Sequence, residues 1–208
     1  MENTLSYTNI SDNRYVVLGV AFDWGQRKGL DIFVELSHRL PKESYRIVLV
    51  GTDDNIDGLL PKDILSIHRT QNQHQLAELY TLADVFLIPT REENYPTVNL
   101  ESLACGTPVV TFRTGGSPEM LDDKTGIVVD ANDIEATEKA IKDICEKKRC
   151  NDEEYIVAYS KKFDMKKKVC RIHRIVRECF RGIKNAFRKE LHKQDDVYTS
   201  FPVFTQHI

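Results

Sequence analysis

The chain has 208 residues, 41% of them hydrophobic, and a formal net charge of -3, a composition that suits one domain with a sizeable core. It contains no run of eighteen apolar residues, and its first residues lack the basic and apolar regions of a signal peptide, so neither a membrane-spanning helix nor secretion is expected. Five cysteines without a C-x-x-C spacing argue against a disulfide framework or a zinc site. We therefore expect a cytoplasmic protein with reduced cysteines.

Strand and helix signals alternate from residue 14 to about residue 149. Apolar runs bounded by turn residues predict six strands, at residues 15–20, 46–50, 64–68, 84–88, 108–112 and 126–129. Helical periodicity predicts helices at residues 30–40, 73–83, 97–104 and 133–148, with a further helical turn after Ser117. Residues 52–58, rich in Asp and Gly, are predicted as a loop. The alternation predicts an α/β fold with a parallel sheet of about six strands and helices on both faces.

The C-terminal part of the chain differs in charge from the rest. Residues 161–193 hold thirteen Lys and Arg against three Asp and Glu, which leaves a charge of -13 for the remaining residues. Their apolar residues recur at three- and four-residue steps, which predicts one amphipathic helix with a cationic face. Residues 195–208 show no such period and are expected to form a disordered tail.

Two carboxylates follow the buried strand at residues 84–88. Glu93 falls in the loop of residues 89–96, called the acid loop below, and Glu101 falls in the next helix. In an open parallel sheet ligands bind at the carboxyl ends of the strands, and a carboxylate can accept hydrogen bonds from both vicinal hydroxyls of a ribose or hexose. The alternative is that Glu101 caps a helix or pairs locally and that Glu92 and Glu93 are only solvated.

A basic pair follows the first strand. The loop of residues 21–29, called the basic loop, carries Arg27 and Lys28 just before a helix, where free N–H groups and the helix dipole favour an anion such as a phosphate. The alternative is a solvated basic pair. The loop lacks the G-x-G-x-x-G fingerprint, which disfavours a dinucleotide-dependent enzyme.

A third loop, residues 113–119, is called the glycine loop. Its paired residues Gly115 and Gly116 allow close backbone approach, and Ser117 with Pro118 opens a helical turn whose N-terminus can face an anion. Turn formation alone also explains these residues.

The order of these motifs resembles the C-terminal, nucleotide-sugar-binding half of the family 4 retaining glycosyltransferases, which have the GT-B fold. The resemblance covers roughly residues 15–180. The matching pieces are Lys28-Gly29, Pro89, the Glu93 to Glu101 spacing, Cys105-Gly106-Thr107-Pro108-Val109-Val110 and Gly115-Gly116-Ser117-Pro118-Glu119.

The resemblance implies specific roles for the residues that match. Lys28 and Arg27 would neutralise the diphosphate of a departing nucleotide such as UDP, and Glu93 would contact the donor sugar, so these three are the expected catalytic residues. Glu101 would hold the ribose hydroxyls, and the base would lie near residues 68–70. The further donor-binding residues would be Asn94, Tyr95, Pro96 and Thr97. No metal or other cofactor is expected, because the chain has no D-x-D motif.

The resemblance also implies a domain organisation. Residues 14–150 would form a single Rossmann-like donor-binding domain, preceded by a lead-in at residues 1–13 and followed by C-terminal helices at residues 151–194. The expected function is retaining hexosyl transfer in polysaccharide biosynthesis, to a glycan or a lipid-linked acceptor. The expected partners are a nucleotide-sugar donor and an N-terminal acceptor domain or partner chain, with no nucleic acid.

Three features depart from the family pattern. The family often has a Gly-Arg pair just after the first strand, where this chain reads Gly19-Val20-Ala21-Phe22. The usual Gly-Phe-Gly after the first acid is replaced by Asn94-Tyr95-Pro96, and the chain contains one of the two similar domains of a complete enzyme. A catalytically inactive fragment or interaction module therefore remains an alternative. The basic helix of residues 161–193 would then contact a protein partner or an anionic membrane, at the inner face of the membrane.

Overall fold

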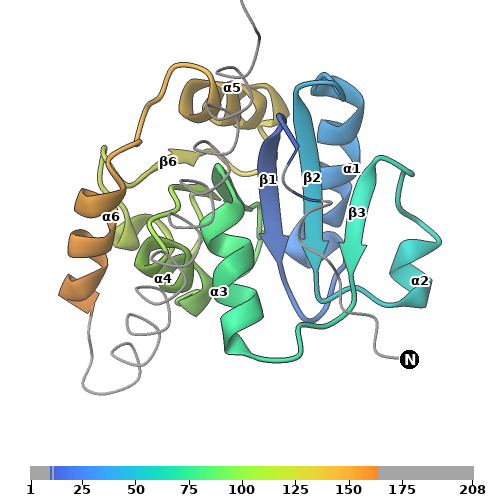
Figure 1. Ribbon diagram of the computed structural model, residues 1–208, viewed down its shortest axis with the longest axis horizontal. Coiled ribbons are helices and arrows are strands. Elements are labelled where there is room, and N and C mark those ends of the chain that lie inside the picture. Colours follow the sequence, from blue (N-terminus) through green and yellow to red (C-terminus); the bar gives the residue numbers. More distant parts are fainter. Residues whose placement is uncertain (1–9, 11, 164–208) are drawn as a thin grey trace, which may run out of the picture.

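The computed structural model describes Ile10 and residues 12–163. Within this part of the chain, six parallel strands form one sheet in the order β3-β2-β1-β4-β5-β6 (Figure 1). The strands are β1 (Tyr15–Val20), β2 (Tyr45–Val50), β3 (Ile64–Ile67), β4 (Val85–Ile88), β5 (Val109–Phe112) and β6 (Gly126–Val129). In the middle of the sheet Val17 of β1 lies opposite Ile47 on one side and Val85 on the other. The predicted parallel α/β sheet is confirmed.

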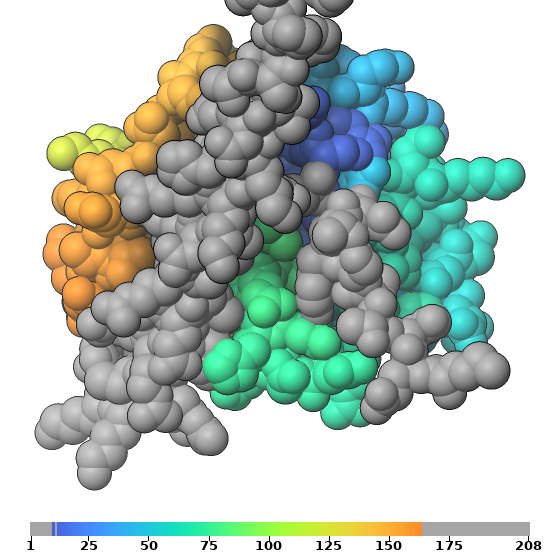
Figure 2. All heavy atoms as spheres, viewed as in Figure 1, coloured from blue at the N-terminus to red at the C-terminus, as the bar shows by residue number. Residues whose placement is uncertain are grey.

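Helices connect the strands and cover both faces of the sheet, as predicted. The α-helices are α1 (Leu30–Arg39), α2 (Asp54–Asp57), α3 (Gln73–Leu82), α4 (Thr97–Ala104), α5 (Ile134–Cys145) and α6 (Glu153–Ser160). Residues 12–163 also contain three single turns of 3-10 helix, which are η2 (Gln26–Lys28), η3 (Pro118–Met120) and η4 (Lys161–Phe163). Figure 2 shows in space-filling form the face that carries α3 (green) and α6 (orange).

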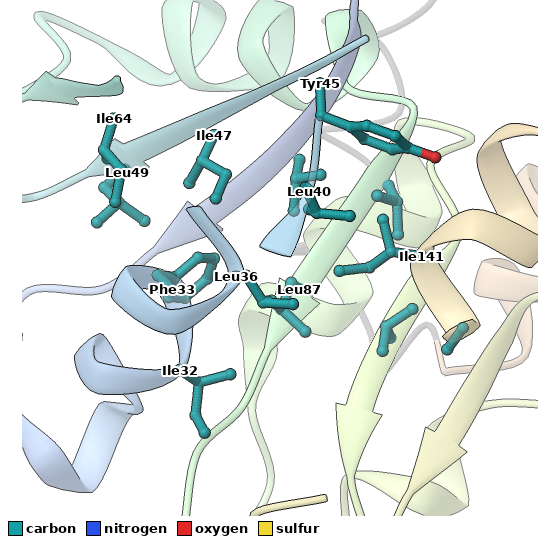
Figure 3. Packing of buried hydrophobic residues seen from close by; sticks show 14 of the residues in the cluster. Ile32, Phe33, Leu36, Leu40, Tyr45, Ile47, Leu49, Ile64, Leu87 and Ile141 are labelled. Atoms are coloured by element: carbon teal, nitrogen blue, oxygen red, sulfur yellow. The ribbon is translucent and has the colours of Figure 1, made fainter. Parts of the chain in front are cut away.

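The core consists of two apolar layers, one on each face of the sheet. Successive residues of a strand point to opposite faces, so Val17 packs toward α1 and α5 while Val16 and Leu18 pack toward α3, α4 and α6. Figure 3 shows the first layer, in which Phe33 and Leu36 of α1 meet strand residues such as Leu87. Because both faces are covered, the strands are apolar along nearly their whole length.

Two secondary-structure predictions are wrong, whereas the other elements predicted between residues 14 and 149 agree with their predicted bounds to within one residue. Residues 52–58, predicted as a loop, contain the one-turn helix α2, which forms because the side chain of Asp53 accepts a hydrogen bond from the backbone N–H of Ile56 at 2.9 Å. The helix predicted to reach residue 148 ends at Cys145, and Lys148 adopts a left-handed backbone conformation with φ of 56°.

Several other predictions lie largely outside the described residues. These are the N-terminal lead-in, the basic amphipathic helix of residues 161–193 with its proposed membrane contact, and the tail of residues 195–208. Among the helices of the described part, none combines the length and apolar character needed to cross a bilayer.

The strand order fixes where a ligand site can form. From β1 the chain moves outward through β2 to β3, and then returns to place β4 on the other side of β1. The loops that leave β1 and β4 therefore run to helices on opposite faces of the sheet, and the carboxyl ends of two such strands are where ligands of open α/β sheets bind. These two loops are the basic loop and the acid loop.

Candidate functional site

Lys28 and Glu93 meet at this end of the sheet. The Lys28 Nζ donates a hydrogen bond to Glu93 Oε2 at 2.8 Å, and each side chain is 21% exposed. The backbone N–H of Asn94 donates to the other carboxylate oxygen of Glu93 at 3.1 Å. Burial by itself raises the pKa of Glu93, but the hydrogen bond and charge of Lys28, with smaller contributions from Asn94 and Arg27, lower it below its ordinary value. Glu93 is thus held ionised beside an ammonium group.

The backbone of the basic loop brings Lys28 into this position. Lys28 ends the 3-10 turn η2, and the following Gly29 adopts a left-handed conformation with φ of 75° before α1 begins. A Cβ atom at Gly29 would lie 2.4 Å from the carbonyl oxygen of Pro89. Glycine is therefore required both by the backbone angle and by the close approach of the acid loop.

Arg27 lies beside the pair and is less constrained. Its side chain is 49% exposed, and its guanidinium lies 3.4 Å from the carboxylate of Asp23. The sequence predicts Arg27 and Lys28 at the N-terminus of a helix. The structure places both in η2, one residue ahead of α1.

The glycine loop supports the acid loop from β5. The backbone N–H of Gly116 donates to the carbonyl oxygen of Asn94 at 2.7 Å. At Gly115, whose φ is 53°, a Cβ atom would lie 1.7 Å from the carbonyl oxygen of Glu93. The paired glycines therefore allow two loops to pack backbone to backbone behind Glu93, which is the close approach that their sequence predicts.

The remaining expected donor-binding residues of the acid loop lead into α4. Tyr95 is 47% exposed, and Pro96 precedes the first helical residue, Thr97. No side chain caps this end of α4, so the first N–H groups of the helix are left for another acceptor.

Glu101 points toward a different element from Glu93. It accepts a hydrogen bond from the hydroxyl of Tyr80 on α3 at 3.3 Å and lines a cavity of about 70 Å³ between α3 and α4. Burial raises the pKa of Glu101 above its ordinary value, although the bond from Tyr80 works in the opposite direction. The two acids therefore have contrasting environments: a cation stabilises the anion of Glu93, whereas Glu101 lies partly buried against a tyrosine hydroxyl.

Two groups of site residues were not predicted from the sequence. Arg91 of the acid loop makes a bidentate ion pair with Asp31 of α1, with both N–O distances below 3 Å. Beneath the acid and glycine loops, fully buried Asn99 donates to Ser117 Oγ at 2.7 Å, and Ser117 Oγ lies 2.7 Å from Thr111 Oγ1. Short-range sequence patterns give no signal for either contact. Asn99 and Ser117 lie 18 residues apart in the chain, and Arg91 and Asp31 lie 60 residues apart.

The residues expected near a nucleotide base follow β3, which β2 separates from β1. His68 Nε2 lies 2.7 Å from Asp57 Oδ2 of α2, and this hydrogen bond raises the pKa of His68. The structure shows no contact between this pair and the Lys28–Glu93 pair among the described residues.

Residues 8–163 match the family model of the group 1 glycosyl transferases. The chain therefore belongs to this family, and the resemblance seen in its motifs is confirmed. A D-inositol 3-phosphate glycosyltransferase of Xylanimonas cellulosilytica is 32% identical over 51% of this chain and 28% of its own length. A GDP-mannose-dependent alpha-(1-6)-phosphatidylinositol monomannoside mannosyltransferase of Mycolicibacterium smegmatis is 34% identical over 57% of this chain and 35% of its own length.

Solved structures show the same fold. WaaG, a glycosyltransferase involved in lipopolysaccharide biosynthesis, aligns with a TM-score of 0.65 and 22% identity, covering 81% of this chain and 48% of that one. Anabaena HepE, solved with UDP-glucose, aligns with a TM-score of 0.62 and 19% identity over 82% of this chain and 49% of its own. The chain thus spans about a third of the length of these curated relatives and about half of each structural neighbour.

Proposed function

We propose that this domain binds a nucleoside-diphosphate sugar and serves retaining hexosyl transfer to a glycan or lipid-linked acceptor. The observation that carries the proposal is the Lys28–Glu93 ion pair at the switch point of the sheet, in a chain of a glycosyltransferase family. An ammonium and a carboxylate side by side suit a ligand that joins an anionic diphosphate to a polyhydroxylated sugar.

Lys28 is proposed to meet the charge of the diphosphate. An ammonium group has three donors, and Glu93 uses one of them, which leaves two for phosphate oxygens. Arg27, half-exposed next to it, can turn from Asp23 to supply a second charge. The uncapped start of α4 adds N–H groups. Preorganised charges of this kind stabilise a leaving group as it departs, so the proposal includes no metal ion.

Glu93 is proposed to face the sugar and Glu101 the ribose. Lys28 keeps Glu93 ionised and oriented, so that Glu93 can accept hydrogen bonds from sugar hydroxyls beside the reacting carbon. Glu101 is partly buried with one hydrogen bond from Tyr80, and a carboxylate has about four acceptor positions. Ribose hydroxyls would provide the additional donors that burial of this carboxylate requires.

The acceptor side of the reaction is proposed to come from a second domain or chain. This chain spans 28% and 35% of the lengths of the two bacterial transferases described above. The candidate site lies at the carboxyl ends of β1 and β4, so a partner placed over the basic and acid loops would complete a cleft. Donor binding is expected from the present chain alone, whereas transfer is expected with that partner.

Calorimetric titration of the 208-residue chain with UDP, GDP and ADP tests the donor role. We expect binding of one diphosphate, UDP being the first candidate, and a loss of about ten- to a hundred-fold in affinity for Lys28→Ala, because a charge-assisted hydrogen bond contributes about 1.5–3 kcal/mol. Glu101→Ala should also weaken binding.

The matched control is Arg39→Gln, which removes one charge from the opposite end of α1. Arg39 bonds Glu35 and, across to α5, Glu135. Its loss should leave the affinity unchanged. The proposal fails if no nucleoside diphosphate binds, or if Lys28→Ala binds as tightly as the parent chain.

A further inference from the structure

Arg91 ties together three separate elements around the candidate site. Its Nη1 and Nη2 donate to Asp31 Oδ1 and Oδ2 of α1 at 2.8 and 2.7 Å. Its Nε donates to Asn132 Oδ1, ahead of α5, at 2.6 Å, and Nη1 also donates to the carbonyl oxygen of Gln26. The side chain is 25% exposed. A planar guanidinium with five donors is thus used on both of its edges.

The backbone of the same residue holds the basic loop. The Arg91 N–H donates to the carbonyl oxygen of Arg27 at 2.9 Å, and Thr90 Oγ1 also donates toward that oxygen, at 3.3 Å. The carbonyl groups of Gln26 and Arg27 are therefore both bonded to the acid loop. These are the two residues immediately before Lys28.

The contacts have a direct geometric consequence for the ion pair. Arg91 lies two residues before Glu93, and the two carbonyls that it holds belong to the two residues before Lys28. The separation between the acid loop and the basic loop is thus fixed next to the point where Lys28 and Glu93 meet at 2.8 Å. Lysine at position 91 would supply a single ammonium and could not reproduce this planar set of bonds.

We propose that Arg91, together with Asp31, is a positioning residue that holds the backbone before Lys28 against the acid loop and so sets the geometry of the Lys28–Glu93 pair. The inference deepens the proposed function, because the same pair is proposed to bind the donor. Arg91 acts through Lys28 and makes no contact of its own with the donor.

The first test needs no ligand and follows the ionisation of the Glu93 carboxyl by carbon-13 NMR from about pH 7 to about pH 3. The informative variant is Asp31→Asn. Removal of a negative charge by itself lowers the pKa of a nearby carboxyl, whereas a Lys28 that moves away from Glu93 raises it. We expect the pKa of Glu93 to rise, in the direction produced by Lys28→Met. An unchanged or lowered pKa of Glu93 overturns the positioning role.

Arg91→Gln gives the second test, by calorimetry with the nucleoside diphosphate that binds and with the corresponding nucleoside. We expect about a tenfold loss of affinity for the diphosphate and no change for the nucleoside, which does not reach Lys28. In a Lys28→Ala background, Arg91→Gln should cause no further loss, because residues that act through one group are not additive. An additive loss, or an equal loss for the nucleoside, contradicts the inference.

Two further measurements separate positioning from general stability. Arg39→Gln, which removes an arginine that links α1 to α5 away from the site, should leave both the Glu93 pKa and the diphosphate affinity unchanged. If Arg91→Gln does not fold, Asp31→Asn is used for the binding test as well. This variant is the milder one, because the amide oxygen that replaces the carboxylate can still accept one hydrogen bond from Arg91. If the parent chain binds no diphosphate, the donor role fails while the Glu93 titration still decides the positioning role.

Discussion

At the scale of single residues, the candidate site depends on a few positions where the chain has little choice of side chain. Lys28 provides the charge, and Gly29 allows the next backbone step to pass close to Pro89. Glu93 is kept ionised by Lys28, while Glu101 lies partly buried beside Tyr80. Substitutions of Gly29 and of Glu101 have effects on stability that can be measured without a substrate.

Gly29→Ala should lower the free energy of unfolding by about 1–3 kcal/mol, because φ of 75° is strained for alanine and its Cβ would press on the Pro89 carbonyl. Gly25→Ala is the control from the same loop. Its φ of -179° is extended and a Cβ there meets nothing within 4 Å, so an effect within about 0.5 kcal/mol is expected. Urea denaturation measures both, and equal effects would contradict the account of Gly29.

Glu101→Gln should change how stability depends on pH. The folded-state pKa of Glu101 is raised above its ordinary value of 4.5, so its contribution is fully present below pH 4.5 and is lost as the pH rises through the raised value. Glutamine does not titrate. The stability of Glu101→Gln relative to the parent chain should therefore increase as the pH rises above 4.5 and then level off. A difference that shrinks with rising pH would contradict the burial of this carboxyl.

At the scale of elements, the order of the strands explains why the site forms. β1 and β4 are neighbours although α1, β2, α2, β3 and α3 lie between them in the chain. Their loops meet at the carboxyl edge, and the glycine loop after β5 closes on the acid loop from the other side. Three loops from adjacent strands thus surround one carboxylate, Glu93.

The buried Asn99–Ser117 hydrogen bond joins α4 to the glycine loop. Ser117→Ala should lower the free energy of unfolding by about 1–3 kcal/mol, because it leaves a buried Asn99 amide group without its acceptor. In an Asn99→Ala background the same substitution should cost less, with a coupling energy of about 0.5–3 kcal/mol. Thermal and urea unfolding of the four proteins of this cycle give the coupling. Strict additivity would show that the bond does not link the two elements.

The sequence predicts these elements well because its signals are local. The predictions coincide with β1 at Tyr15–Val20 and with α4 at Thr97–Ala104, where continuous apolar runs and helical periodicity are clear. Helix α2 was missed because four residues are too few to show a period, and its stability comes from the cap by Asp53. Such a short helix can be predicted only by testing each Asp in a loop as a possible helix N-cap.

The contacts of the candidate site were less predictable. Lys28 and Glu93 were both expected at the carboxyl edge, but their pairing depends on β4 lying beside β1. Arg91 was not expected to contribute, since an arginine in a polar loop has an ordinary explanation in solvation. The position of Asp31 also has an ordinary explanation, because the helix dipole favours an acidic residue in the first turn of a helix. The fold had to bring them together before either could be recognised.

At the scale of the whole molecule, the chain presents its candidate site at the carboxyl ends of the central strands β1 and β4. It belongs to the group 1 glycosyl transferases, and it covers 48% and 49% of two structural neighbours of the same fold. The proposed reaction therefore divides into donor binding, which the described residues can support, and acceptor binding, which a second domain or chain would supply. Adding a partner should change turnover, with donor affinity already present in this chain.

A crystal structure of this chain with the nucleoside diphosphate that it binds is the most direct measurement of the central claim. We predict diphosphate oxygens within hydrogen-bonding distance of Lys28 Nζ and ribose hydroxyls against Glu101, with the Lys28–Glu93 contact retained. A diphosphate bound elsewhere, for example in the cavity at the amino ends of β4 and β5 that Asp84 and Lys148 line, would contradict the assignment of the site.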